Sequence, residues 1–247
     1  MSGLGLALRY LTVLPAPAGG HDSPDRLGRA AGWFPVVGLF LGVLLVVVDR
    51  VMSGVFPSLV AAVLTVAAWK VLTGGLHLDG LADTVDGLAG HDAEHRLAIM
   101  RDSRIGTFGT VSLVLLLLLA VVAVAALPPP VRWRVLLAAP VIARAMPPVL
   151  ARCFRPARPE GHGAAFAGGV RAAGVVLALG VAVVVAFLAL GAAGVAATLL
   201  ALLVSGAAVA FVSRRLGGIT GDVLGAAVEL AELTVVLTVL AWLGAQA

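Results

Sequence analysis

The sequence predicts an all-α protein, a polytopic transmembrane helix bundle of about seven spans. Three observations carry this prediction: 61% of the 247 residues are hydrophobic, only 12% are charged, and apolar runs of about 20 residues recur along the chain. A soluble domain of this length would carry about twice that share of charged residues, and about 20 apolar residues are what a helix needs to cross a bilayer. We therefore expect a single integral membrane domain over residues 1–247, with the lipid bilayer as its surroundings.

Seven apolar segments have the length of a membrane-crossing helix. The fourth contains Arg144 and three prolines, and the connection between the fifth and sixth is very short and uncharged. Before the first of them, residues 4–14 (LGLALRYLTVL) predict an interfacial helix that Pro15 and Pro17 stop. Residues 1–30 are thus expected to form a cytoplasmic or interfacial N-terminal segment. The predicted spans are 31–48, 58–76, 107–127, 131–150, 172–190, 194–212 and 223–244.

The arginines divide unevenly between the two sets of connections. By the positive-inside rule, the richer set faces the cytoplasm, which places the N-terminus inside and the C-terminus outside. Residues 77–106, 151–171 and 213–222, which carry the unusual polar residues, then lie on the cytoplasmic side. The richer set holds Arg9, Arg26, Arg29, Arg96, Arg101, Arg104, Arg152, Arg155, Arg158, Arg171, Arg214 and Arg215, and the other holds Arg50, Arg132 and Arg134.

Charge and cysteine content exclude some kinds of site. The net charge of +4 is accounted for by arginines that set the topology, so it does not indicate a nucleic-acid partner. Cys153 is the single cysteine of the chain. An intramolecular disulfide and a cysteine-rich metal site are therefore excluded.

The stretch GGLHLDGLADTVDGLAG, residues 74–90, gathers carboxylates with no basic residue among them. Asp79, Asp83 and Asp86 are spaced i, i+4, i+7 and share one face of a helix. Like charges close to a membrane repel strongly. Carboxylate oxygens suit Mg²⁺, which also takes substrate phosphates as ligands, and metal ions can clamp a phosphoryl group during transfer. The region 77–106 is thus expected to be an acidic catalytic segment; the alternative is a helix end that exposes solubilising acids.

His77 lies in the same stretch as the three aspartates. It is a candidate metal ligand or acid/base, or a structural hydrogen-bonding residue.

Three further stretches carry polar residues at expected helix ends. MRDSRIGTFG, residues 100–109, fits an anion site at a helix N-terminus, or ordinary anchoring with a helix cap. In GGITGDVLGAAVELAE, residues 217–232, Glu229 lies inside a span and either reaches the cation site or pairs with Lys70 or Arg144. RCFRPARPEGHG, residues 152–163, is suited either to bind a polyanionic substrate or to fix the membrane topology through its arginines.

Taken in this order, the four stretches resemble the cobalamin synthase family, the adenosylcobinamide-GDP ribazoletransferases. GGLHLDGLADTVDGL carries most of the resemblance, and MRDSRIGTFG, TGDVLGAAVELAE, LRYLTVLPAP and GRAAGWFPVVGLFLG also fit the family pattern. One departure is Val13, where the family pattern leads us to expect an arginine. A substrate contact at that position is therefore in doubt.

The resemblance implies a Mg²⁺-dependent transfer of adenosylcobinamide phosphate from adenosylcobinamide-GDP to α-ribazole or its 5′-phosphate, with release of GMP. It also implies a prokaryotic inner-membrane enzyme whose active site faces the cytoplasm; assembly with other corrinoid enzymes and a homo-oligomer are further hypotheses. We expect catalytic roles for His77, Asp79, Asp83 and Asp86, metal binding by Asp79, Asp83, Asp86, Asp102 and Asp222, and substrate binding by Arg101, Ser103, Arg104, Gly106, Arg155 and Arg158.

Two alternative functions remain open at this point. A phospholipid synthase of the CDP-alcohol phosphotransferase type also uses an aspartate-rich membrane motif with a divalent metal, but its signature pairs DG with a nearby AR, and no AR follows DGLAD here. A cation-coupled transporter would favour carboxylates deep in several spans. Most acids here lie at expected helix ends, with Glu229 and Glu232 as the exceptions.

Overall fold

The computed structural model describes residues 3–15 and 23–246, and within this part all extended regular structure is helical. The expected stop at Pro17 lies outside the described residues. The helices are α1 (Gly3–Leu11), α2 (Pro24–Ala30), the 3-10 helix η1 (Ala31–Trp33), α3 (Phe34–Ser53), α4 (Ser58–Leu72), α5 (Leu76–Gly87), α6 (Ala93–Ile99), α7 (Thr107–Ala126), α8 (Pro129–Arg144), α9 (Met146–Cys153), α10 (His162–Gly169), α11 (Ala172–Leu190), α12 (Ala192–Leu216) and α13 (Gly221–Gly244).

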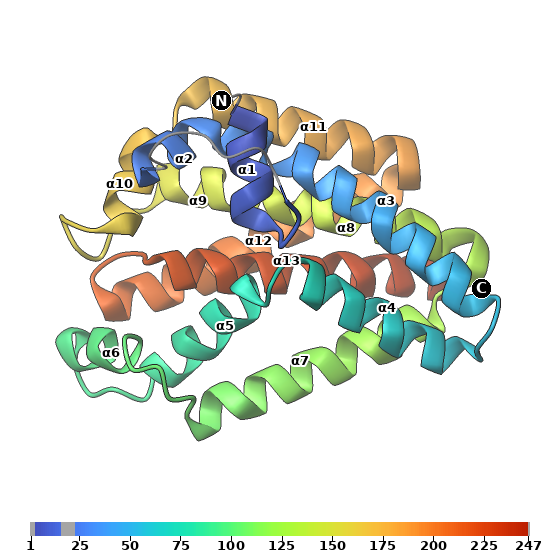
Figure 1. Ribbon diagram of the computed structural model, residues 1–247, viewed down its shortest axis with the longest axis horizontal. Helices are drawn as coiled ribbons and strands as arrows, with labels where there is room; N and C mark the ends of the chain where they lie inside the picture. The colour runs from blue at the N-terminus through green and yellow to red at the C-terminus, as the bar shows by residue number, and fades with distance from the viewer. Residues whose placement is uncertain (1–2, 16–22, 247) are drawn as a thin grey trace.

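The long helices lie side by side as a bundle (Figure 1). Six helical runs within the described residues are long and apolar enough to cross a membrane, and a seventh is counted if the bent pair α4 and α5 is one span. The prediction of an all-α bundle with about seven spans is therefore confirmed. The six runs are Pro24–Ser53, Thr107–Ala126, Pro129–Cys153, Ala172–Leu190, Ala192–Leu216 and Gly221–Gly244.

The second expected span, residues 58–76, is interrupted by a sharp turn. The helix α4 ends at Leu72, and α5 leaves it at an angle of 87°. Gly74 and Gly75 make the turn with φ of +61° and +70°, a region that glycine enters without steric cost. The N–H of Val13 donates to the carbonyl of Leu72 at 2.9 Å, so the segment after α1 is fastened to this turn. The acidic helix α5 consequently leaves the direction of α4 and packs against α13 and α7.

The fourth expected span, residues 131–150, is two helices in the structure. The helix α8 ends at Arg144 and α9 begins at Met146. Gly38 and Gly42 of α3 lie directly on the α8 backbone, and a Cβ on Gly42 would come within 2.5 Å of the carbonyl oxygen of Leu137. The GxxxG pair therefore allows the close approach of α3 and α8.

A cluster of charged side chains is buried between α4, α8 and α13. Lys70 forms ion pairs with Glu229 and, at 2.8 Å, with Glu232. Arg144 pairs with the other oxygen of Glu232, and the indole N–H of Trp69 donates to Glu232 at 3.1 Å. The pairing of Glu229 with Lys70, one of the alternatives for this acid, is confirmed.

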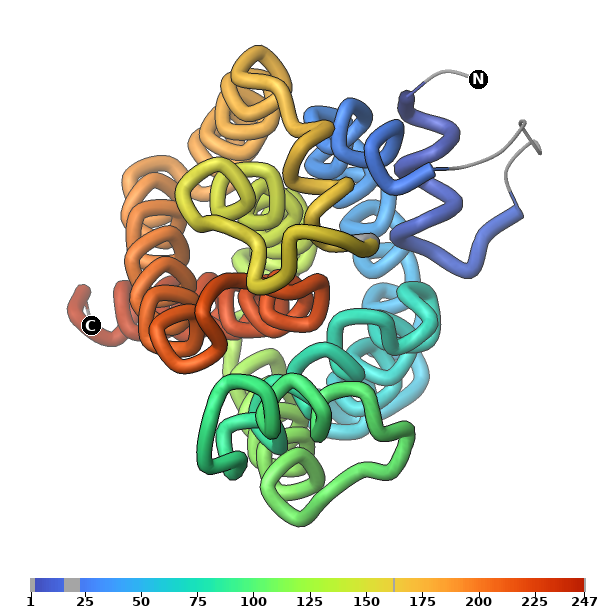
Figure 2. Tube along the Cα trace, turned by 90° about the vertical axis from the view of Figure 1, so that its left-hand side faces the viewer, coloured from blue at the N-terminus to red at the C-terminus, as the bar shows by residue number. Residues whose placement is uncertain are grey.

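The two ends of the bundle differ in charge. Figure 2 looks onto the end where α6, α10 and the turn between α12 and α13 lie, and the C-terminus lies at the opposite end in Figure 1. Arg96, Arg158 and Arg215 belong to the first end, and Arg132 and Arg134 start α8 at the other. The separation predicted from the sequence is thus present in three dimensions.

Candidate functional site

A cavity of about 760 Å³ lies at the arginine-rich end of the bundle. Its walls come from α1, α2, α3, α5, α6, α9 and α10, from the chain around residues 156–163 and from the start of α13. Elements from the first and last parts of the sequence therefore meet around one space. The cavity contains five of the sequence-predicted site residues, which are His77, Asp79, Arg101, Arg158 and Asp222.

The acidic wall depends on close packing of α5 against α13. A Cβ on Gly80 would come within 2.7 Å of the carbonyl oxygen of Asp222, so only a glycine fits without displacement. This contact places Asp79 and Asp222 on the same wall. Asp83, one turn further along α5, interacts electrostatically with both of these carboxylates. At the start of α13, the Thr220 hydroxyl accepts the N–H of Val223 at 3.3 Å and donates to Asp222 at 3.2 Å.

Asp86 faces a different neighbour, the first turn of α7. Its carboxylate accepts the N–H of Gly106 at 2.7 Å and the N–H of Gly109 at 2.8 Å. A carboxylate at a helix N-terminus is favoured by the helix dipole and by the unpaired N–H groups there. Asp86 thus connects α5 to α7 and lies away from the cavity wall. Its role as a metal ligand, and substrate binding by Gly106, remain predictions.

Arg101 and Arg158 are two of the three arginines that line the cavity within the described residues, with Arg9 as the third. Arg158 also donates to the carbonyl of Leu97 at 3.1 Å. Burial and the neighbouring Arg101 lower the pKa of the Arg158 guanidinium, while Asp222 opposes this shift. Arginines and carboxylates therefore share this lining, and the guanidinium groups are suited to bind the oxygens of a diphosphate.

Seven predicted site residues lie outside the cavity lining; besides Asp83, Asp86 and Gly106, they are Asp102, Ser103, Arg104 and Arg155. Arg104 forms a bidentate pair with Asp102, with a shortest contact of 2.6 Å, and its hydrogen bonds hold the pKa of Asp102 at about 2. These two charges largely neutralise each other at an exposed position. Ser103 is exposed, and Arg155 donates to the carbonyl of Gly217 at 3.2 Å. The structure does not bring Asp102, Ser103, Arg104 or Arg155 to the cavity, and their predicted roles remain untested.

His77 lies at the floor of the cavity. It is 3% exposed, and its Nδ1 has no hydrogen-bond partner among the residues that the structure describes. The cluster of Lys70, Arg144 and Glu232 is close enough to act on it electrostatically. A buried polar atom without a partner is costly, so a ligand in the cavity is a suitable partner for this nitrogen.

Sequence reasoning missed the aromatic side of the cavity. Tyr10, Phe34 and Phe166 line it, and Phe34 stacks against each of the other two, with ring centroids 6.3 and 6.1 Å apart. Tyr10 lies in the stretch LRYLTVLPAP, which already carried part of the family resemblance. The approach of Phe166, more than 150 residues away in sequence, gives no local signal.

The carboxylates near the cavity fit a Mg²⁺ ion that is shared with a substrate. Within residues 3–15 and 23–246, no group of three or more His, Cys, Asp or Glu side chains is arranged to hold a metal by itself. Mg²⁺ in phosphoryl-transfer sites is usually held by one or two carboxylates, with water and substrate phosphates completing its shell. Asp79 and Asp222, with Asp83 close by, supply such a partial set.

The fold and the cavity define a class: multi-pass membrane proteins with a carboxylate- and arginine-lined cavity at one end of the helix bundle. Within that class, the chain belongs to the cobalamin-5-phosphate synthase family, CobS, whose model matches residues 3–241. The resemblance inferred from the motifs is thereby confirmed, and neither the phospholipid synthase nor the transporter is favoured.

Relatives match over nearly the whole chain. The chain is 40% identical to the adenosylcobinamide-GDP ribazoletransferase of Geotalea daltonii, over 96% of each protein. It is 41% identical to the protein of that name from Pseudomonas fluorescens, over 95% of this chain and 97% of the relative. The identity to the one from Bradyrhizobium diazoefficiens is 38%, over 97% of this chain and 93% of the relative. No solved structure matches the chain.

Proposed function

We propose that this chain is an adenosylcobinamide-GDP ribazoletransferase. In this reaction, adenosylcobinamide phosphate passes from adenosylcobinamide-GDP to α-ribazole or its 5′-phosphate, GMP leaves, and adenosylcobalamin or its 5′-phosphate forms. The observation that carries the proposal is about 40% identity to proteins of that name over at least 94% of this chain. The cavity supports it, because carboxylates and arginines meet there as transfer from a diphosphate requires.

The bond changes are those of a phosphoryl transfer. A ribose hydroxyl oxygen of the acceptor bonds to the phosphorus nearest the cobinamide, the bond from that phosphorus to the bridging oxygen breaks, and GMP keeps that oxygen. Negative charge builds up on the phosphate oxygens and on the leaving group. Arg101 and Arg158 lie on the cavity wall and are proposed to bind these oxygens.

The proton of the attacking hydroxyl needs an acceptor. His77 is proposed for this role, because it lines the cavity, is buried and has an Nδ1 atom without a partner among the described residues. Asp79 is the alternative acceptor, since its carboxylate lines the same cavity. A proton taken up at either residue would be returned to solvent or to the departing GMP.

We propose Mg²⁺ as the cofactor, with Asp79 and Asp222 as its protein ligands and Asp83 in support. A bound Mg²⁺ would neutralise part of the diphosphate charge. Asp222 also attracts the guanidinium of Arg158 electrostatically.

The proposed location is the cytoplasmic membrane of a prokaryote, with the cavity facing the cytoplasm. The concentration of arginines at the cavity end supports this orientation. Association with other enzymes that act on corrinoids, and self-association, remain hypotheses. Co-purification of tagged chain from membranes, with mass spectrometry of its partners, tests both.

The first experiment uses purified chain in lipid with adenosylcobinamide-GDP and α-ribazole, in Mg²⁺ or in EDTA, followed by chromatography of corrinoids and GMP. We expect cobalamin and GMP in equal amounts with Mg²⁺, and neither product with EDTA. Absence of product from a folded preparation, with either form of the acceptor, would refute the proposed function. Product formation in EDTA would refute the Mg²⁺ assignment but not the proposed function.

A further inference from the structure

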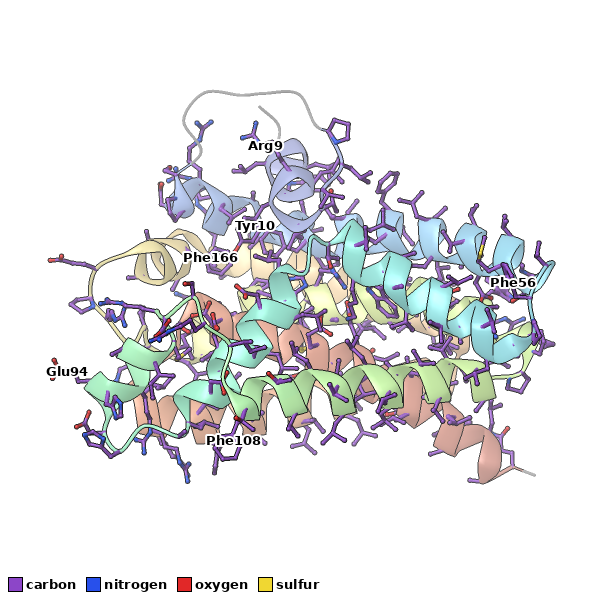
Figure 3. The ribbon with its side chains drawn as sticks, turned by 60° about the horizontal axis from the view of Figure 1, so that its bottom comes forward. Arg9, Tyr10, Phe56, Glu94, Phe108 and Phe166 are labelled. Atoms are coloured by element: carbon purple, nitrogen blue, oxygen red, sulfur yellow. The ribbon has the colours of Figure 1, made fainter. Side chains whose placement is uncertain are left out.

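One side of the cavity is mostly apolar and aromatic, with Arg9 and Ser23 as its polar members, in contrast to the charged wall formed by α5 and α13. Tyr10 of α1, Phe34 of α3 and Phe166 of α10 form a three-ring stack there, with interplanar angles of 19° and 20°. Figure 3 labels Tyr10 and Phe166, which are far apart in the sequence and both line the cavity. Leu6, Leu11 and Leu27 continue this surface, which we call the aromatic wall.

The aromatic wall is held in place by backbone packing. Gly28 of α2 lies so close to the carbonyl of Phe166 that a Cβ could not be accommodated there. Gly169, on the same helix as Phe166, lies equally close to the carbonyl of Asp25. Phe34 is 1% exposed and Phe166 8%, whereas Tyr10 is 47% exposed and has a free face. The wall therefore offers a preformed flat surface whose outer ring is accessible.

We propose that the aromatic wall binds the planar base of the acceptor nucleoside, the benzimidazole ring of α-ribazole. This inference rests on the proposed function and assigns one substrate to one side of the cavity. Stacking on an aromatic side chain suits any flat ring. The cavity has a volume common for sites that enclose a drug-sized ligand, which includes a nucleoside.

The chemistry of the wall favours benzimidazole over guanine, the other base in the reaction. Guanine carries an exocyclic amine and a carbonyl, and burying them against Leu6, Leu11, Leu27 and Phe34 would leave them without partners. Benzimidazole has no exocyclic polar group and loses little when its edges are buried.

The position of the wall also fits the chemistry of transfer. Tyr10 is close enough to Asp222 for the two side chains to interact electrostatically. A base stacked on Tyr10 would therefore place its attached ribose next to the charged wall. The ribose hydroxyl would then face Asp79 and the arginines that are proposed to bind the diphosphate.

The test compares Tyr10→Leu and Phe166→Leu with the unaltered chain in lipid, with KM measured separately for α-ribazole and for adenosylcobinamide-GDP. We expect the KM for α-ribazole to rise about 3- to 10-fold in Tyr10→Leu, the loss expected for one stacking contact, and by a smaller factor in Phe166→Leu, because Phe34 lies between Tyr10 and Phe166. The KM for adenosylcobinamide-GDP should stay within about 2-fold, and Tyr10→Phe, which keeps the ring, should restore the acceptor KM. A rise confined to the KM of adenosylcobinamide-GDP, or no change in either KM, would overturn the proposal.

A control and a binding measurement complete the design. Phe56→Leu removes an exposed aromatic ring at the opposite end of the molecule, as Figure 3 shows, and should change neither KM. Calorimetric titration with α-ribazole alone separates this inference from the proposed function. A chain without transferase activity that binds α-ribazole, and loses binding in Tyr10→Leu, would refute the function and keep the subsite. Equal binding by the unaltered chain and by Tyr10→Leu would refute the subsite.

Discussion

Gly80 on α5 lies directly on the backbone of Asp222 on α13, and a Cβ there would come within 2.7 Å of the Asp222 carbonyl oxygen. The acidic wall of the cavity therefore depends on the absence of a side chain at Gly80. Two helices that carry the proposed metal ligands can approach only because the residue between Asp79 and Leu81 is a glycine.

Gly80→Ala is expected to separate α5 from α13 and to misplace Asp79 relative to Asp222. Overpacking of this kind costs about 1–3 kcal/mol of stability, and a displacement of about 1 Å at a reacting centre can lower the rate about 100-fold. Turnover and thermal unfolding in detergent measure the two effects. Gly180→Ala in α11 is the control, because nothing lies within 4 Å of its Cβ position. Unchanged turnover in Gly80→Ala would show that this contact does not set the geometry.

Asp86→Ala should act mainly on stability. The variant removes both hydrogen bonds to the N–H groups of Gly106 and Gly109 and leaves the first turn of α7 without its acceptor. The expected loss is about 1–3 kcal/mol, within the range for bonds to a charged group and for helix caps. Thermal unfolding in detergent is the measurement. If stability stayed normal while turnover disappeared, the catalytic role predicted from the sequence would be favoured instead.

Asp79→Asn and Asp222→Asn are expected to leave folding intact and to lower kcat/KM by about 100-fold or more, because each removes a charge that faces the substrate. The Mg²⁺ concentration needed for half-maximal rate should rise in both. Asp83→Asn is likewise expected to abolish turnover without unfolding the protein. Rates measured over a Mg²⁺ titration test all three variants. A normal Mg²⁺ response in Asp79→Asn or Asp222→Asn would remove that residue from the proposed metal site.

Glu232→Leu should destabilise the chain by about 3–5 kcal/mol, because Arg144 loses its carboxylate partner in a buried setting. In the double variant Glu232→Leu with Arg144→Met, Lys70 still pairs with Glu229, so the loss should be smaller. Thermal unfolding of both variants in the same detergent measures the two losses of stability. Equal losses in the single and double variants would show that the charge balance of the cluster contributes little.

The fold follows from composition to a large extent, because a run of about 20 apolar residues has few alternatives to a membrane-crossing helix. The turn after α4, in contrast, could not be predicted from composition. Leu76 and Leu78 continue the apolar character of residues 58–72, so the hydropathy of the stretch hides the 87° bend that Gly74 and Gly75 make. A pair of adjacent glycines was the local signal, but glycine is frequent throughout this chain, with 30 residues.

The candidate site, like the fold, could be predicted from the sequence only in part. The spacing of Asp79, Asp83 and Asp86 predicts one helix, and α5 confirms it over Leu76–Gly87. The neighbour of each carboxylate depends on where α7 and α13 pack, which sequence spacing does not encode. Asp86 accordingly faces the N–H groups of α7 while Asp79 lines the cavity.

The cavity joins Tyr10, near the beginning of the chain, to Asp222 in the last helix. A ribosome releases these two parts far apart in time, because α13 follows all the other helices that line the cavity. A nascent chain that stops before residue 221 would already contain every other predicted site residue and still lack an enclosed site. An enclosed site therefore forms only after α13 has been made and packed against α5, so chains that stop earlier lack one wall of the cavity.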